Sequence, residues 1–271
     1  MKAVIQLHRG EVMVDLSRPI SLSLPVDFSG GGPRHFGAPA AASQPFVAPG
    51  FSGAVTTGAS CNCATITLTP HCNGTHTECV GHLTREPLDA HGVIPPGLLP
   101  TLLLSIEPVE ASMTREGTEP APRSGDRLIT GQAIERGWLL NGEVEFRASE
   151  AFEPRALVIR SVAQTSELAP YLTREAAALL VERGIEHLVV DLPSIDRAQD
   201  EGRLTAHRIF FGLPSGSHRL AEATRPRSTI TELAHIPEGL ADGWYLLELQ
   251  APALAGDAVP SRPLLYSLQT S

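Results

Sequence analysis

A cluster of side chains that can bind a metal ion, between positions 71 and 82, most constrains how this chain can fold. Three imidazoles and one carboxylate fall within these twelve residues, as His71, His76, Glu78 and His82. Neutral imidazole nitrogens and carboxylate oxygens hold Zn²⁺ or Mn²⁺ in sites that keep one position open for water. The fold must therefore bring these side chains to one place.

The spacing of these residues predicts the local backbone. On an extended strand His76 and Glu78 point to the same face because they are two residues apart, and His82 shares that face if the strand continues. Gly81 and the odd step of five residues from His71 to His76 require a turn or a bulge on either side, and Asn73-Gly74 is a suitable sequence for one of them.

The alternative is that these histidines are ordinary surface or core residues that lie close together by chance. Ten histidines are spread over the chain, and a single histidine usually binds no metal. Here, however, three of them surround a carboxylate, without the basic or histidine-rich run that marks a tag or a low-complexity segment. We therefore interpret residues 71–82 as a metal site.

The same residues resemble the signature His-x-Gly-Thr-His-x-Asp-x-x-x-His of the metal-dependent cyclase family, whose best understood members are bacterial kynurenine formamidases and isatin hydrolases. Asp15–Ile20 resembles the opening DLS-P strand of that family, and Gly184–Asp196 resembles its block that ends in Ser-Ile-Asp. His207 and Glu232 stand where the family places a further histidine and a glutamate of the metal centre. The matching blocks follow the family order over most of the chain.

The resemblance implies an α/β fold: a layered β/β/α swivelling domain with a barrel-like β core and helices on one side, formed by residues 1–271 as one domain. It implies a centre of one or two Zn²⁺ or Mn²⁺ ions, with Glu78 as a possible bridge between them. The implied ligands are His71, His76, Glu78, His207 and Glu232. Asp191 and Asp196 are expected to be structural groups or to orient a ligand imidazole.

The implied activity is hydrolysis of an amide carbon–nitrogen bond, as by an arylformamidase of tryptophan catabolism. A bound ion lowers the pKa of water from ~15.7 to about 7, which makes the water a nucleophile near neutral pH. His82 follows the ligands, and we expect it to accept the proton of this water and return it to the leaving nitrogen. Its alternative role is to orient Glu78. Hydrolysis of a cyclic amide or a lactone, as by an isatin hydrolase, is the alternative activity.

Two departures from the family signature leave the metal and the substrate class open. Asn73 is an extra residue between the first two histidines, and Glu78 stands where the family has aspartate. Because glutamate is one methylene longer, the metal or the backbone has to shift to keep the oxygen near ~2.1 Å from the ion. We expect the two departures to compensate for each other.

Two other classes of protein are compatible with the sequence. A non-catalytic metal-binding module would close the site with a thiolate from Cys72 or Cys79. A scaffold protein would keep the fold without the chemistry, but it has no physical reason to retain His82, His207 and Glu232 together. The four cysteines lack Cys-x-x-Cys spacing, which predicts reduced thiols near the site.

Residues 28–53 form a long segment rich in Gly, Ala and Pro, which predicts a loop. Its phenylalanines, Phe36, Phe46 and Phe51, either wall an aromatic substrate pocket or simply dock on the core. Among the remaining histidines, His35 is the one that we expect to enter this pocket.

The rest of the chain predicts a strand-rich fold. Alternation and apolar runs predict a hairpin of residues 3–7 and 11–16 and strands at 65–69, 102–109, 156–162 and 185–191. One clear helix begins after the N-cap residue Thr173 and stops at Gly184, and a second helix at 203–211 carries His207. Ser194 lacks the Gly-x-Ser-x-Gly context of a nucleophile.

Composition limits the function classes. Hydrophobic residues make up 42% of the chain and charged residues 19%, which is typical of a globular protein. The net charge of −9 and the lack of a Lys/Arg cluster argue against a nucleic-acid partner. The sequence shows no membrane span, no signal peptide and no nucleotide-binding motif. We expect a cytoplasmic homo-oligomer that acts on a small-molecule substrate.

Overall fold

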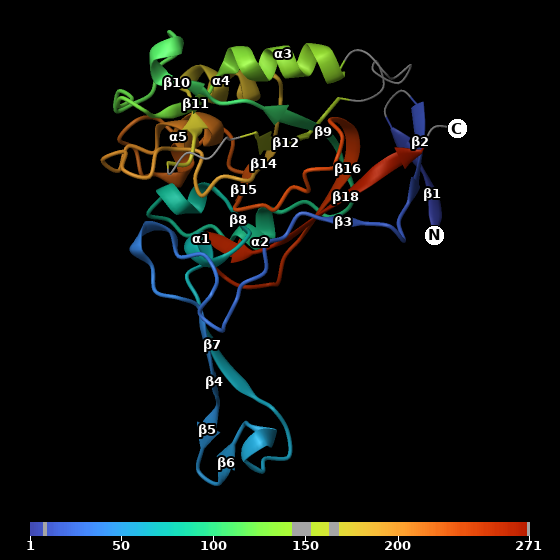
Figure 1. The fold of residues 1–271 in the computed structure, drawn as a ribbon, viewed down its shortest axis with the longest axis vertical. Helices are drawn as coiled ribbons and strands as arrows, with labels where there is room; N and C mark the ends of the chain where they lie inside the picture. The colour runs from blue at the N-terminus through green and yellow to red at the C-terminus, as the bar shows by residue number, and fades with distance from the viewer. Residues whose placement is uncertain (8–9, 143–152, 163–167, 270–271) are drawn as a thin grey trace.

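The computed structural model describes residues 1–7, 10–142, 153–162 and 168–269. They fold around one large mixed sheet (Figure 1). In sheet order its strands are β1 (Lys2–Leu7), β2 (Gly10–Asp15), β18 (Arg262–Gln269), β16 (Gly243–Gln250), β9 (Leu99–Ile106), β12 (Ala156–Ser161), β14 (His187–Val190), β15 (Thr229–Glu232), β8 (His76–Glu78) and β17 (Ala258–Pro260). β3 (Ile20–Ser21) pairs with β18 beside this order.

Parallel strands form the middle of the sheet, where both faces are buried. β9, β12, β14 and β15 run parallel to one another. Their successive side chains point to opposite faces, so Leu102 and Leu157 belong to one hydrophobic cluster, whereas Leu103 and Val158 belong to another. This two-sided burial explains why the central strands are continuous apolar runs.

Helices cover the first of these two faces (Figure 1): α3 (Gly131–Gly142), α4 (Arg174–Glu182) and α5 (Thr205–Phe211). Ile134, Leu180 and Phe210 of these helices pack in the same cluster as the strand side chains of that face. α4 begins where the sequence predicts, because the Thr173 hydroxyl accepts a hydrogen bond from the Ala176 amide.

The sheet curves around the second apolar cluster. β3 pairs with β18, and directly after β3 the Ser23–Ala234 bridge joins the chain to the segment that follows β15. These contacts lead from β18 back to β15 and close a ring of strands around Leu22 and Leu247. The structure thus confirms an α/β fold with a barrel-like β core and helices on one side.

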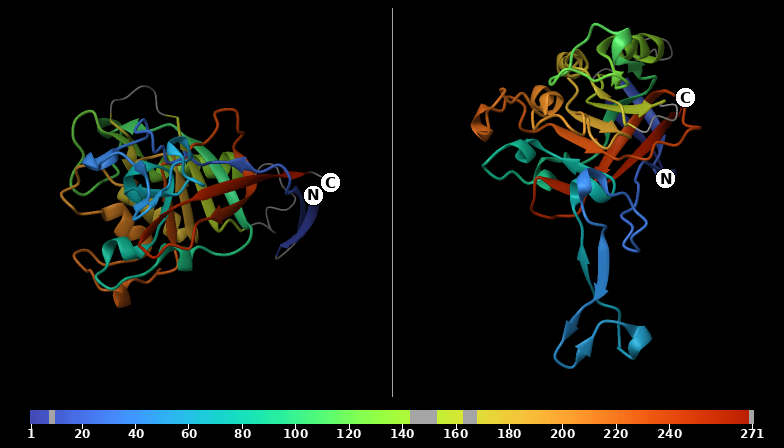
Figure 2. Two further views of the ribbon diagram at one scale, coloured as in Figure 1. Left: turned by 90° about the horizontal axis from the view of Figure 1, so that it is seen from below. Right: turned by 60° about the vertical axis from the view of Figure 1, so that its left-hand side comes forward.

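A slender arm leaves this body between residues 42 and 67 (Figures 1 and 2). Its stem pairs β4 (Ala42–Pro45) with β7 (Ala64–Thr67), and its far end pairs β5 (Val47–Ala48) with β6 (Phe51–Ser52). The prediction of one loop at 28–53 is therefore wrong. The predicted strand at 65–69 exists, but it belongs to the arm, and His71 stands on the one-turn helix α1 (Pro70–Asn73).

The other predicted elements are confirmed, and several elements are additional. β1 and β2 form the predicted hairpin, and β9, β12, β14, α4 and α5 match the predicted strands and helices. The helix α3 and the strands β16 and β18 are present although no sequence pattern predicts them. Short elements complete the described chain: α2 (Ala90–Val93), a small sheet of β10 (Val109–Glu110), β11 (Arg127–Ile129) and β13 (Tyr171–Leu172), and 3₁₀ turns at 35–37, 55–57, 80–83, 111–113 and 220–222. Within the described residues, no helix has the length and apolarity needed to cross a bilayer.

Candidate metal centre

Three of the predicted ligands meet because β8 pairs with β15. The two strands are antiparallel, with Glu232 opposite His76 and Ile230 opposite Glu78. Residues directly opposite each other in an antiparallel pair share a face, as do residues two apart on one strand. His76, Glu78 and Glu232 therefore project from one face, as the alternation predicts for the first two.

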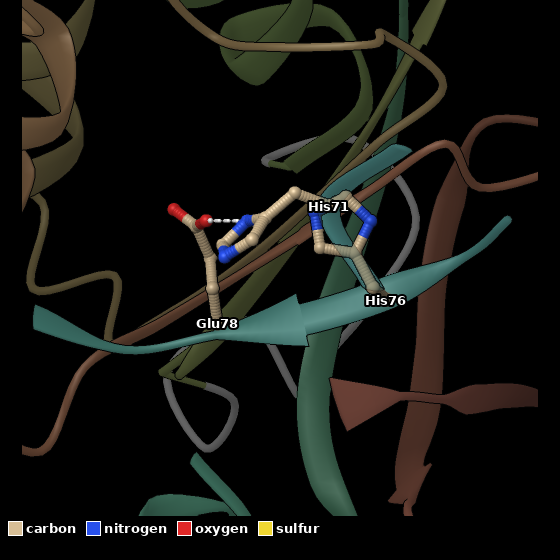
Figure 3. A group of neighbouring side chains, drawn as sticks. All are labelled: His71, His76 and Glu78. Atoms are coloured by element: carbon tan, nitrogen blue, oxygen red, sulfur yellow. Dashed lines mark ion pairs between the residues drawn. The ribbon is translucent and has the colours of Figure 1, made fainter. Parts of the chain in front are cut away.

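His71 reaches the same place from α1, which precedes β8 (Figure 3). The chain turns at Gly74, where a Cβ atom would lie 3.0 Å from Val26 Cγ2 and 3.1 Å from the Leu24 carbonyl oxygen. Glycine is required for such a close approach between two segments. The predicted turn is confirmed here, and it places His71 Nδ1 3.0 Å from Glu78 Oε2.

α5 supplies His207, and Asp196 fixes its orientation. The Asp196 carboxylate accepts hydrogen bonds from the Ala206 and His207 amides, at 2.9 and 3.0 Å, and so caps the start of α5. Asp196 Oδ2 also accepts a hydrogen bond from His207 Nδ1 at 2.7 Å, and His207 Nε2 then lies 2.9 Å from Glu78 Oε1. Asp196 therefore orients a ligand imidazole, as expected.

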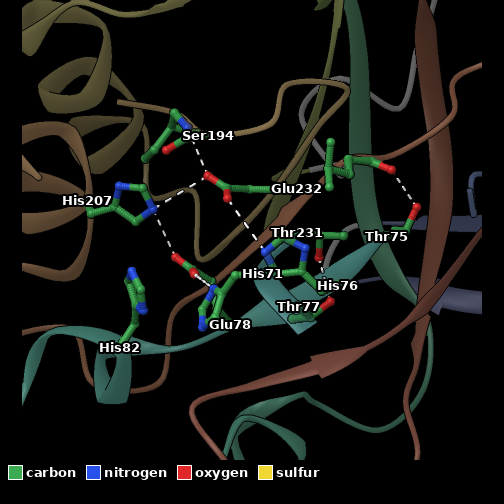
Figure 4. A network of polar contacts seen from close by, with 12 residues as sticks. His71, Thr75, His76, Thr77, Glu78, His82, Ser194, His207, Thr231 and Glu232 are labelled. Atoms are coloured by element: carbon green, nitrogen blue, oxygen red, sulfur yellow. Dashed lines mark hydrogen bonds and ion pairs between the residues drawn. The ribbon is translucent and has the colours of Figure 1, made fainter. Parts of the chain in front are cut away.

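Glu78 joins two groups of ligands (Figure 4). His71, His76 and Glu78 form the first group, and Glu78, His207 and Glu232 form the second; the ligand atoms of each group lie within 4.8 Å of one another. Glu232 Oε2 lies 3.6 Å from His76 Nε2, and Glu232 Oε1 lies 3.5 Å from His207 Nε2. The structure thus brings all five predicted ligands together.

The donor atoms of this cluster fit a divalent metal ion. His76 Nε2 and both carboxylate oxygens of Glu78 are buried without a hydrogen-bond partner of suitable geometry. His76 Nδ1 donates to the Gly74 carbonyl at 3.1 Å, so Nε2 presents its lone pair to the cluster. Buried polar atoms without partners are rare in native proteins. Zn²⁺ and Mn²⁺ both accept imidazole nitrogen together with carboxylate oxygen, so either ion would satisfy these atoms.

Opposite charges make the burial of these acids tolerable. Burial raises the pKa of Glu78, but the charges of His82 and His207 outweigh this effect and hold the pKa well below its usual range. Burial likewise lowers the pKa of His207, but Glu78 and Asp196 raise it well above its usual range. A divalent ion that displaces the histidine protons supplies comparable positive charge. Metal binding therefore releases protons and weakens in acid.

Thiolates are not part of these groups. The Cys79 thiol donates to the Leu88 carbonyl at 3.2 Å, and burial raises its pKa to about 11. Cys72 is buried, whereas Cys61 and Cys63 are exposed on the arm, so the expectation that all the cysteines lie near the site is wrong for this pair. In the described part of the chain, no candidate metal group includes a cysteine, which disfavours a closed thiolate site.

His82 lies at the more exposed side of the cluster. The strand ends at Glu78 and residues 80–83 form a 3₁₀ turn, which confirms the turn or bulge expected at Gly81. The turn brings the His82 ring centroid to 4.3 Å from that of His71 and 5.9 Å from that of His207. His82 Nδ1 lies 3.2 Å from Oδ2 of Asp257, which no sequence motif marks as a site residue.

Asn73, the extra residue of the motif, anchors a neighbouring segment. Its side-chain amide donates to the carbonyls of Pro33 and Pro39, each at 3.1 Å, and its oxygen accepts a hydrogen bond from the Thr69 amide. Asn73 therefore ties α1 to residues 33–39. This structural role is separate from the compensation with Glu78, which stays a prediction.

The anchored segment carries His35 and Phe36. Burial and the charge of His76 lower the pKa of His35, and Glu232 raises it, so His35 lies within electrostatic reach of the ligands. Phe36 lines a cavity of about 230 Å³ together with Asp196. His35 itself does not line this cavity, so its entry into the pocket stays a prediction.

Phe46 and Phe51 lie in a different part of the molecule. Both belong to the outer half of the arm, where their ring centroids are 6.3 Å apart. Figure 1 shows this end of the arm well separated from β8. Within one chain, the structure therefore brings Phe36, but neither Phe46 nor Phe51, close to the metal ligands.

Two further polar residues, Ser194 and Asp191, make structural contacts. The Ser194 hydroxyl accepts a hydrogen bond from the Asp196 amide at 3.2 Å, which is a turn contact and not a nucleophile–base pair. The Asp191 carboxylate accepts a hydrogen bond from the Ser161 amide. The contact of Asp191 is therefore structural, which is one of the two roles expected for it.

Comparison with known proteins shows the family of this chain. Residues 14–197 match the model of the Cyclase family. The chain belongs to the Cyclase family. Among curated protein sequences, none matches this cyclase-family chain.

Solved structures share the fold of this cyclase-family chain at low sequence identity. A predicted metal-dependent hydrolase from Bacillus stearothermophilus has a TM-score of 0.55 and 16% identity, over 92% of this chain and 98% of that chain. A potential metal-dependent hydrolase with cyclase activity has a TM-score of 0.56 and 17% identity, over 92% and 98%. Isatin hydrolase A from Labrenzia aggregata, bound to benzyl benzoate, has a TM-score of 0.53 and 14% identity, over 93% and 94%.

Substitution of His76 tests the ligand assignment. We expect His76→Ala to lower the amount of bound metal, because a central buried donor is lost, and to leave the fold intact, because the apolar clusters lie elsewhere. Elemental analysis and circular dichroism measure the two effects. The matched control is His187→Ala, since His187 is also buried but bonds to Thr229 outside the ligand groups. Full metal occupancy in His76→Ala would refute the assignment.

Substitution of Glu78 tests its shared position. Glu78→Asp withdraws the carboxylate by roughly one carbon–carbon bond, whereas metal sites tolerate only about ±0.2 Å. Because both groups use Glu78, we expect affinity for Zn²⁺ and Mn²⁺ to fall at every bound ion. Glu78→Gln, which keeps the length and removes the charge, is the comparison variant. Unchanged titration curves in Glu78→Asp would show that this carboxylate binds no ion.

Proposed function

We propose that this chain is a metal-dependent hydrolase of an amide carbon–nitrogen bond, similar to an arylformamidase. The observation that carries the proposal is the pair of ligand groups that share Glu78, with the more exposed His82 beside them. The groups can hold one or two Zn²⁺ or Mn²⁺ ions, and the His82 side chain beside them is 28% exposed. This arrangement combines a Lewis-acid site with a separate proton acceptor.

The proposed mechanism assigns a role to each part of the site. His71, His76, Glu78, His207 and Glu232 would hold the metal, which when bound supplies Lewis-acid activation of water and of the substrate carbonyl. His82 accepts a proton from the water as the water oxygen bonds to the carbonyl carbon. His82 then donates that proton to the nitrogen as the carbon–nitrogen bond breaks. The products are a carboxylic acid and an amine.

The cavity beside Phe36 supports an aromatic substrate. Its lining combines the rings of Phe36, Tyr171 and Pro193 with charged side chains, and Asp196 connects it to His207. An aryl formamide would place its ring in this cavity and its formyl carbon toward the ligands. A cyclic amide or a lactone is the alternative substrate, and the isatin hydrolase A structure, solved with benzyl benzoate, shows an aromatic ester bound on the same fold.

An activity panel with a His82 variant tests this function. We expect the metal-loaded protein to hydrolyse N-formylkynurenine faster than isatin or simple lactones. His82→Ala should keep the metal and lose about 10²- to 10⁴-fold in turnover, because the proton acceptor is removed. Loss of metal with normal turnover per bound ion would make His82 a ligand instead. No turnover of any panel substrate by the metal-loaded protein would contradict the proposed activity.

The proposal includes a homo-oligomer that assembles through the arm. No Asp, Glu, Lys or Arg occurs from position 35 to position 77, which includes the whole arm. Val47, Val55 and Ile66 of the arm are 71%, 50% and 55% exposed in the single chain. An uncharged extension with exposed aliphatic side chains is stabilised when another surface covers it. A second copy of the chain supplies such a surface symmetrically, since each copy offers one arm and one body.

Charge substitutions on the arm test this assembly. Val47→Lys combined with Ile66→Lys should reduce the mass measured by light scattering to that of one chain, because lysine resists burial without a partner. Both side chains are exposed in the single chain, so its fold should not change. Leu140→Lys on α3 is the matched control, since Leu140 is 64% exposed. A parent protein that is monomeric in solution would refute the proposed assembly through the arm.

A further inference from the structure

Asp257 lies next to the metal ligands although no motif marks it. It directly precedes β17, and β17 pairs with β8 in a register that places Ala258 opposite Glu78. The Asp257 carbonyl accepts a hydrogen bond from the Cys79 amide at 3.0 Å. The backbone of Asp257 is therefore fixed against the end of β8, between Glu78 and the turn that carries His82.

One oxygen of this carboxylate contacts two imidazoles. Asp257 Oδ2 lies 2.9 Å from His71 Nε2 and 3.2 Å from His82 Nδ1. A carboxylate accepts hydrogen bonds, so each of these ring nitrogens carries the proton in this contact. The other nitrogen of His71, Nδ1, is the one that faces Glu78 at 3.0 Å.

We infer that Asp257 is a positioning residue that sets the tautomers of a metal ligand and of the proton acceptor at the same time. By holding the proton on His71 Nε2, Asp257 leaves the Nδ1 lone pair for the ion. Carboxylates that bond to the outer N–H of a ligand histidine do the same in many metal sites. By holding the proton on His82 Nδ1, Asp257 leaves Nε2 to accept a proton from water. This inference rests on the proposed function for the role of His82, and on the ligand geometry alone for the role of His71.

The shared oxygen has a structural consequence. The two imidazoles cannot move independently, because each is bonded to the same atom, and their ring centroids lie 4.3 Å apart. Asp257 thereby keeps the proton acceptor at a fixed distance from a ligand of the first group. A residue in this position affects metal affinity and turnover together, through the two imidazoles that it contacts.

The test compares Asp257 variants with a matched control. Asp257→Ala removes both hydrogen bonds, and Asp257→Asn keeps an acceptor oxygen but removes the charge. Asp89→Asn is the control, since the Asp89 carboxylate accepts a hydrogen bond from the amide of Gly256, the neighbour of Asp257, at 2.8 Å. A purely structural role for Asp257 would give the same result as this control.

Two readouts do not depend on activity. We expect the affinity for Zn²⁺, measured by competition with a chelator from the metal-loaded protein, to fall about 10- to 100-fold in Asp257→Ala and less in Asp257→Asn. We expect ¹⁵N NMR of the histidine rings in the zinc-loaded protein to show the His71 and His82 tautomers as fixed in the parent protein and mixed in Asp257→Ala. Asp89→Asn should change neither. Unchanged affinity and tautomers in Asp257→Ala would overturn the inference, as would equal changes in Asp89→Asn.

A third readout separates the inference from the proposed function. On a panel substrate that is turned over, Asp257→Asn should lower kcat and leave KM nearly unchanged, because Asp257 lies behind His82 and not in the cavity beside Phe36. A raised KM with an unchanged kcat would contradict the positioning role. If no substrate is turned over, the proposed function fails, and the affinity and NMR results still decide the role of Asp257 toward His71.

Discussion

The register between β8 and its two neighbouring strands determines the geometry of the candidate metal centre. On one side it places Glu232 opposite His76, and on the other it places Ala258 opposite Glu78. A shift by one residue would turn the side chains of β8 to the other face of the sheet and disperse the ligands. Once this register is set, α1 and α5 each have to supply only one imidazole.

The centre is a buried group of polar and charged side chains beside two apolar cores, and its stability depends on the balance of positive and negative charge. Glu78, His76, His207 and Glu232 are almost completely buried. An unpaired buried charge costs several kcal/mol, so each carboxylate has to face a cation. Histidine protons provide these cations in the metal-free state and a divalent ion provides them in the bound state. The apolar clusters on both faces of the sheet offset the cost of keeping this site in the interior.

Short-range patterns in the sequence predicted the parts of the fold and site that depend on neighbouring residues. The ligand run from His71 to Glu78, the Thr173 cap of α4 and the apolar strands β9, β12 and β14 are such patterns. Family resemblance added His207 and Glu232, which no local pattern marks as ligands. α3 was missed because glycines at its start, middle and end weaken the helical pattern, and β18 was missed because Pro263 stands inside it.

Other features could not be predicted because they arise from pairing over long distances. Asp257 is 175 positions from His82, and only the pairing of β17 with β8 brings the two together. The arm strands β4 and β7 consist largely of Ala, Ser and Thr, so no apolar alternation marks them. For the same reason, the position of Phe46 and Phe51 in the outer arm cannot be derived from their spacing to Phe36.

The central claim is that Glu78 joins two ligand groups into one metal centre. Anomalous diffraction at the zinc absorption edge, on crystals of the zinc-loaded protein, tests it most directly. The account predicts anomalous density in contact with the Glu78 carboxylate, on the side of His71 and His76, on the side of His207 and Glu232, or on both. Zinc bound elsewhere, with the Glu78 carboxylate in contact only with histidine nitrogens, would contradict the account.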